Sequence, residues 1–270
     1  MRDHGNGRGS NSTLLLGVVF LVLGAILSYL PSPRDAFAAL DYNEVIGPLL
    51  FWSAFAILLL TFPLRSAAKT CLRSLHTRQG AVIFCVYLVI HLFVYGFLLE
   101  LILASIYGIS VPLTPSLIVT TNVFSPPSPV STLFNLGFNP SISFDLPPVL
   151  SGALSFYAVA VAVLVDVLIL ANIGEARKLR RSSGLGRLRA SYVLMPVLGL
   201  VLGASCCISV PALVSYAFPS AATGATYDWI YDASYFFFPA FAISILFANL
   251  RSTGLILAFL RRETTPSNGT

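Results

Sequence analysis

Six long apolar runs divide the chain. They cover roughly residues 13–30, 46–64, 81–107, 148–173, 191–217 and 229–249. Each run is long enough to cross the hydrocarbon core of a bilayer as a helix, which takes about 20 residues. The runs are apolar on every side, whereas a helix at the surface of a soluble protein is apolar along one stripe. The pattern therefore predicts an all-α polytopic membrane protein, with residues 1–270 as a single integral membrane domain of six transmembrane helices.

Composition agrees with this pattern. The 270 residues are 56% hydrophobic and 10% charged, and their mean hydropathy is +0.84. Soluble domains carry about 25% charged residues, so these charges are too few to cover the surface of a soluble protein of this size. The composition excludes a soluble globular protein.

The basic residues predict the orientation in the membrane, because they collect in cytoplasmic loops. Fifteen of the sixteen lie in the N-terminal tail, in the loops after the second and fourth runs, and at the C-terminal end. The other three loops hold one basic residue, Arg34, and six acidic ones, which are Asp35, Asp41, Glu44, Asp145, Asp228 and Asp232. We therefore expect both termini to be cytoplasmic, with the plasma membrane as the location. An alternative is a signal peptide that ends at Ala36-Phe37-Ala38, whose removal would leave five helices.

The net charge of +5 follows from this topology and needs no nucleic acid as a partner. The most basic loop, residues 175–190, is expected to contact anionic lipid headgroups, with a cytoplasmic protein partner as the alternative.

The longest segment between runs, residues 108–147, holds seven prolines from Pro112 to Pro147 and one charge, Asp145. Proline removes backbone donors and favours extended or turn conformations. Interleaved Leu, Ile, Val and Phe argue against a disordered linker, which would be polar or charged. We expect an ordered extracytoplasmic cap between the third and fourth helices, which serves as a lid or as a contact surface for a partner subunit.

Apart from Asp232, counted above with the outer loops, three ionisable residues lie inside the runs, where each is costly and therefore a candidate functional residue: His91, Glu100 and Asp166. His91 is a candidate proton relay or a metal, haem or quinone contact, and the alternative is a histidine hydrogen-bonded between helices. Asp166 is a candidate ion or proton site, and the alternative is an ion pair with an arginine from a cytoplasmic loop. His91 and Glu100 are nine positions apart, which places them on opposite faces of a helix, so they form no common site by themselves.

The fifth run contains Cys206 and Cys207, followed by Pro211. Pro211 lacks an N–H, so the carbonyl of Cys207 loses its helical partner and a kink is expected there. The small residues around the two cysteines favour close helix packing. A kinked helix with two thiols is also a candidate site for a soft ion such as Cu(I). The outer acidic residues Asp145, Asp228 and Asp232 are candidates for attracting a cation. No cofactor is predicted.

The sequence contains no G-x-S-x-G, H-E-x-x-H, G-x-x-x-x-G-K or G-x-G-x-x-G motif, so we expect no catalytic activity of the chain on its own. Three functions stay open. The first is an accessory or structural subunit of a larger membrane complex, with other membrane subunits as partners. The second is a small transporter that uses the kinked fifth helix with His91 and Asp166. The third is a metal- or redox-handling protein that uses Cys206 and Cys207.

Overall fold

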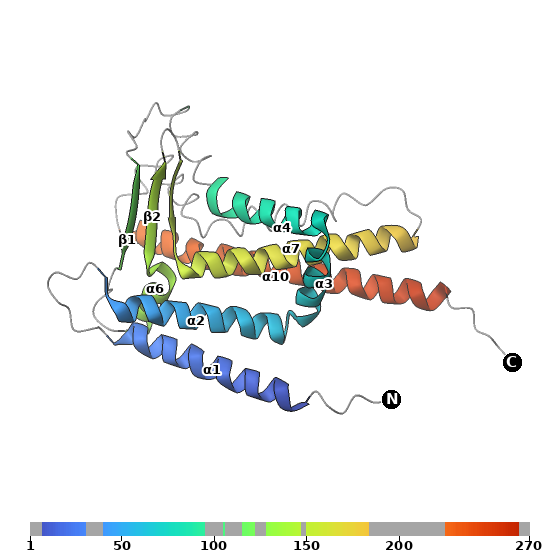
Figure 1. Ribbon diagram of the computed structural model, residues 1–270, viewed down its shortest axis with the longest axis horizontal. Coiled ribbons are helices and arrows are strands. Elements are labelled where there is room, and N and C mark those ends of the chain that lie inside the picture. The colour runs from blue at the N-terminus through green and yellow to red at the C-terminus, as the bar shows by residue number, and fades with distance from the viewer. Residues whose placement is uncertain are drawn as a thin grey trace. The chain divides into compact units, whose positions relative to one another are not determined.

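The computed structural model describes residues 7–30, 40–94, 105, 115–121, 128–146, 150–183 and 225–264. Most of these residues are helical (Figure 1). The helices are α1 (Gly7–Tyr29), α2 (Tyr42–Thr61), α3 (Arg65–Leu75), α4 (Arg78–Val89), the π-helix η1 (Ile90–Val94), α6 (Pro129–Phe138), α7 (Phe156–Ser183) and α10 (Ala225–Thr264). The strands are β1 (Ser116–Thr120), β2 (Ser141–Leu146) and β3 (Leu150–Leu154). The chain divides into a first unit, residues 1–63 and 96–160, and a second unit, residues 64–95 and 161–270.

Four of the described helices are long and apolar enough to cross a membrane: Ser12–Tyr29, Tyr42–Thr61, Phe156–Leu179 and Tyr235–Phe259. They correspond to the first, second, fourth and sixth apolar runs. The third run begins in α4 and η1, and most of its remainder lies outside the described residues, as does the whole fifth run. The helical, apolar character predicted from the sequence is confirmed for these four helices.

In the first unit, α1 and α2 pack against each other, and α6 contacts both. The backbones of α1 and α2 lie close together because Gly24 of α1 and Gly47 of α2 have no side chain in the contact. An ideal Cβ on Gly24 would lie 2.7 Å from the Gly47 carbonyl oxygen, so only hydrogen at this position lets the backbones approach so closely. Trp52 fixes α6 to α2, since its indole N–H donates to the Leu136 carbonyl at 2.6 Å.

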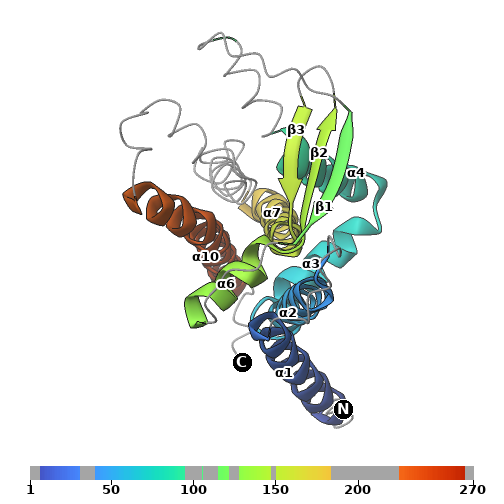
Figure 2. The ribbon, with the colours of Figure 1, turned by 90° about the vertical axis from the view of Figure 1, so that its left-hand side faces the viewer.

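The same unit contains a three-stranded antiparallel sheet in the order β1-β2-β3 (Figure 2). Ile118 pairs with Ser143 in the first ladder, and Phe144 pairs with Gly152 in the second. The all-α prediction is therefore incomplete. The fourth helix was predicted from residue 148, but residues 150–154 form β3 and α7 begins only at Phe156. An apolar run alone does not separate a short buried strand from the first turns of a helix.

In the second unit, three predicted boundaries change. The loop after the second run contains α3, an amphipathic helix that buries Ala67 and Cys71 and is separated from α4 by a bend of 115°. The first part of the basic loop 175–190 continues α7 to Ser183. The sixth helix extends from its predicted range, 229–249, to all 40 residues of α10.

The most buried of the four apolar helices is α7. In its apolar stretch 78% of the residues are buried, against 28% in α2 and in α10 and 17% in α1. Every residue from 164 to 172 is buried. A helix that is buried on all its faces lies in the core of a protein, while α1 exposes apolar surface of the kind that suits lipid.

Candidate functional site

His91 lies in η1, the short π-helical stretch that continues α4. π-helical turns occur often at functional sites, because the extra residue re-aims the side chains around it. The His91 side chain is 0% exposed. The roles of His91 as a relay or a ligand stay predictions, and Glu100 lies outside the described residues.

Asp166 lies in the middle of α7 and is 1% exposed. Neither of its carboxyl oxygens has a hydrogen-bond partner in the part of the chain that the structure describes. The described arginines of α3 and α4 are exposed, so the ion pair considered above is not found among them. A buried carboxyl without such bonds is costly, which marks Asp166 as a residue kept for a reason other than packing.

Cys71 of α3 lies near Asp166 and outside the four apolar helices. Burial, and to a smaller extent the Asp166 carboxyl, raises the pKa of the Cys71 thiol to about 11. The thiol is 2% exposed, so it behaves as a packed side chain and not as a nucleophile.

One turn and a half further along α7, Asn172 joins α7 to α10. Its Nδ2 donates to the Leu246 carbonyl at 3.0 Å, and its Oδ1 accepts from Nδ2 of Asn249 at 2.8 Å. Polar side chains hold apolar helices together in this way. The sequence analysis did not single out these two residues, although an asparagine inside an apolar run is itself a signal.

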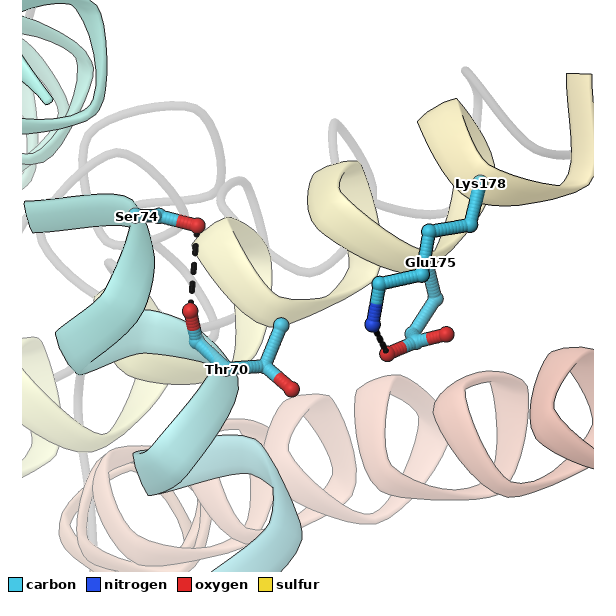
Figure 3. A network of polar contacts seen from close by, with 4 residues as sticks. All are labelled: Thr70, Ser74, Glu175 and Lys178. Carbon is cyan, nitrogen blue, oxygen red and sulfur yellow. Dashed lines mark hydrogen bonds and ion pairs between the residues drawn. The ribbon is translucent and has the colours of Figure 1, made fainter. Parts of the chain in front are cut away.

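The α3–α7 contact lies at the cytoplasmic end predicted for α7 (Figure 3). An ideal Cβ on Gly174 would lie 3.1 Å from Cγ2 of Thr70, so α3 rests closely on this glycine. Ser74 donates to the Thr70 carbonyl at 3.0 Å, and Lys178 pairs with Glu175 at 2.6 Å. Two residues of the predicted lipid-contacting stretch thus bond to each other. The lipid contact itself stays a prediction.

A second buried polar cluster lies in the first unit, where α1 ends and α2 begins. We call it the Glu44 cluster; its members are Ser28, Asp41, Glu44, Asn135 and Asn139. Glu44 is 1% exposed, and its Oε2 accepts a hydrogen bond from Nδ2 of Asn139 at 3.0 Å. Asn135 donates from its Nδ2 to the Ser28 carbonyl at 3.0 Å. Asp41 begins α2, since its Oδ1 accepts from the N–H groups of Asn43 and Glu44.

Sequence reasoning missed this cluster, because it placed Glu44 and Asp41 in an exposed outer loop. The burial of Glu44 depends on Asn139, which is 95 residues away in the sequence. No short-range sequence pattern predicts such a contact. The one available signal was an acidic residue next to an apolar run.

An open apolar groove of about 500 Å³ lies beside α1 and α6 and includes Leu21, Ala25, Tyr29 and Pro129 in its lining. The groove is lined almost entirely by apolar side chains, so it has few polar groups that could orient a ligand. The β1 edge of the sheet is apolar too. Leu117, Ile118 and Val119 are 72%, 53% and 39% exposed, and β1 is an outer strand among the described ones.

The remaining candidate residues lie beyond what the structure describes. Cys206, Cys207 and Pro211 fall outside the described residues, and Asp145, Asp228 and Asp232 are described by their backbone alone. In the described ranges no three His, Cys, Asp or Glu residues gather closely enough to hold a metal ion among themselves.

No family model, curated protein or solved structure was found that matches this chain. The class of protein therefore comes from the fold alone. Its apolar helices are consistent with a membrane protein.

Proposed function

We propose that this chain is a multi-pass protein of the plasma membrane, with both termini cytoplasmic, and that it acts as an accessory or structural subunit of a larger membrane complex. The observation that carries the proposal is the apolar edge strand β1. It lies between the third and fourth apolar runs, in the segment expected to form the outer cap.

The exposure of β1 is unusual for an edge strand. Edge strands are normally protected from other chains by lysine, proline or a bulge. The residues of β1, Ser-Leu-Ile-Val-Thr, include no charge and no proline. Its apolar side chains are exposed on both faces, since Leu117 and Ile118 are neighbours in the strand. An uncharged extended segment of another membrane subunit fits this edge, because it adds main-chain hydrogen bonds and covers apolar side chains.

Affinity purification of the full chain in mild detergent tests the proposal. We expect stoichiometric partners with the wild-type protein and their loss in a Leu117→Lys, Val119→Lys double variant. The matched control is Val130→Lys, which places a charge at an apolar position of α6 that is 61% exposed. The control is expected to keep the partners. A wild-type chain that purifies alone contradicts the subunit role, and partners that survive the double variant contradict β1 as their contact.

Asp166 favours a second function, a small transporter in which the buried carboxyl binds and releases a proton or an ion. Its support is the carboxyl described above, buried in the core helix without a hydrogen bond in the described part of the chain. Proton flux into proteoliposomes under an imposed pH gradient tests this function. Asp166→Asn is expected to abolish the flux at an unchanged folded yield. Glu175→Gln, which removes a carboxylate from the same helix, is expected to keep it. Equal flux in wild type and Asp166→Asn contradicts the transporter.

A further inference from the structure

The Glu44 cluster contains more buried oxygen atoms than its hydrogen bonds satisfy. Oε1 of Glu44, Oγ of Ser28 and Oδ2 of Asp41 are all buried and have no hydrogen-bond partner among the described residues. Ser28 and Glu44 are each 1% exposed, so bulk water does not satisfy these atoms. Unsatisfied buried polar atoms are rare in native proteins and indicate a missing partner such as an ion or a bound water.

Two of these oxygens, Oγ of Ser28 and Oε1 of Glu44, belong to two helices that pack against each other, α1 and α2. A Cβ on Gly47 would clash with Oγ of Ser28, so this hydroxyl rests against α2 at Gly47. Gly47 follows Glu44 by three residues, which is about 4.5 Å along the helix axis. The Ser28 hydroxyl and the Glu44 carboxyl thus approach one place from α1 and from α2.

Two carboxyl groups, those of Glu44 and Asp41, attract a cation here, as does the negative end of the α1 dipole at Tyr29. The positive end of the α2 dipole, where Asp41 is the N-cap, offsets part of this attraction. The one hydrogen bond of the Glu44 carboxyl group in the described ranges comes from the neutral amide of Asn139. A buried carboxyl group with a single neutral donor takes up either a proton or a positive partner, because an unpaired charge is costly away from water.

The geometry points to a binding site for a hard cation, Na⁺ or Ca²⁺, with Glu44, Ser28 and Asp41 as oxygen ligands. Such ions take carboxylate, hydroxyl and carbonyl oxygens, and coupling ions in membrane proteins bind at helix ends in this way. The bound ion would tie the end of α1 to the start of α2. Asn135 of α6 and Asn139, the C-cap of this helix, would hold the ligands in place by their bonds to Ser28 and Glu44. This site is independent of the proposed subunit function.

Thermal unfolding of the purified full chain in detergent tests the site. The probes are NaCl and CaCl₂, each compared with N-methyl-D-glucamine chloride at equal ionic strength. At about 100 times its Kd, the bound ion is expected to raise the Tm of the wild-type protein by roughly 5 °C or more. Equal Tm values in all three salts overturn the proposal.

Variants assign the effect to the named ligands. Glu44→Gln keeps the size of the side chain and is expected to abolish the response to the ion. Ser28→Ala removes one ligand and is expected to raise the ion concentration for half of the Tm shift by at least about tenfold. It keeps the site testable if Glu44→Gln does not fold. A response that both variants retain in full overturns the site.

Two controls complete the experiment. Glu175→Gln removes a carboxylate far from the cluster in sequence and is expected to respond to the ion as the wild type does. Arg34→Gln removes the nearest basic residue in the sequence after Ser28 and keeps every ligand, so its response is expected to persist. A response that is absent in the wild type and appears in Arg34→Gln would assign the positive partner of Glu44 to Arg34 and overturn the ion.

Discussion

Replacing Gly24 by alanine tests the close packing of α1 on α2. An ideal Cβ on Gly24 would lie 2.7 Å from the Gly47 carbonyl oxygen and 2.7 Å from the Phe51 amide nitrogen. Both atoms belong to the backbone of α2, so no side chain can rotate away. Ordinary van der Waals contact begins at 3.4 Å. The two helices must therefore separate locally by about 0.7 Å, the difference between these distances.

The expected cost follows from these contacts. Overpacking of a well-packed contact costs about 1 to 3 kcal/mol, and the rigid backbone places this contact in the upper part of that range. Alanine gains about 1 kcal/mol over glycine from its helix propensity, which offsets part of the cost. The net loss of about 1 to 2 kcal/mol corresponds to a decrease in Tm of roughly 2 to 8 °C.

Circular dichroism of the purified protein in detergent, followed through thermal unfolding, measures this decrease. The matched control is Gly254→Ala in α10, where an added Cβ would meet nothing within 4 Å. The control is expected to keep or raise the Tm, because only the propensity gain remains. A Gly24→Ala variant as stable as the wild type, or an equal loss in both variants, would refute the packing argument.

Three other predictions follow from the described contacts. Alanine at Asn172, at Asn249 and at both positions should give a coupling energy of about 0.5 to 2 kcal/mol in a thermal double-mutant cycle, since the two amides bond each other; purely additive effects contradict the bond. Cys71 should resist iodoacetamide at pH 8 in the folded protein, and its modification, measured by mass spectrometry, should rise toward pH 11, because a raised thiol pKa leaves little thiolate below that pH. Fast modification at pH 8 contradicts its burial. Trp52→Phe should lower stability by about 1 to 3 kcal/mol in thermal unfolding, because it leaves the Leu136 carbonyl without its donor; an unchanged Tm contradicts this bond.

The sequence pattern predicted the helices that lie in apolar runs. This succeeded because a run of about 20 apolar residues has one main structural outcome in a membrane protein. It failed where a local pattern is ambiguous. Residues 150–154 continue the apolar run of the helix that follows them, yet they form β3, because Phe144 and its neighbours in β2 offer a partner strand.

The α3 helix was predictable from its own residues. Ala67 and Cys71 are four apart and buried, while Arg65, Lys69 and Arg73 are also spaced by four and exposed. This is the period of an amphipathic helix. The basic residues of this segment were used to predict the orientation in the membrane. The spacing of the apolar residues between them, which predicts the helix, was not used.

The roles of the candidate site residues stay predictions. His91 and Asp166 lie within long apolar runs, and both are buried in the structure. The Glu44 cluster was beyond prediction, because its environment is made by Ser28, by Asn135 of α6 and by Asn139 after it. Contacts between segments about 100 residues apart leave no local trace in the sequence.

The length of α10 has a consequence for the membrane around it. Its candidate membrane span, Tyr235–Phe259, is mostly apolar but includes Arg251, and it has 25 residues, which is about 37 Å of helix at 1.5 Å per residue. A hydrocarbon core is about 30 Å thick, so an upright α10 would overshoot it by roughly 7 Å. Tilting removes this mismatch, and a smaller tilt suits a thicker bilayer. A helix with this excess can therefore match membranes of different thickness by changing its angle, without exposing apolar side chains to water.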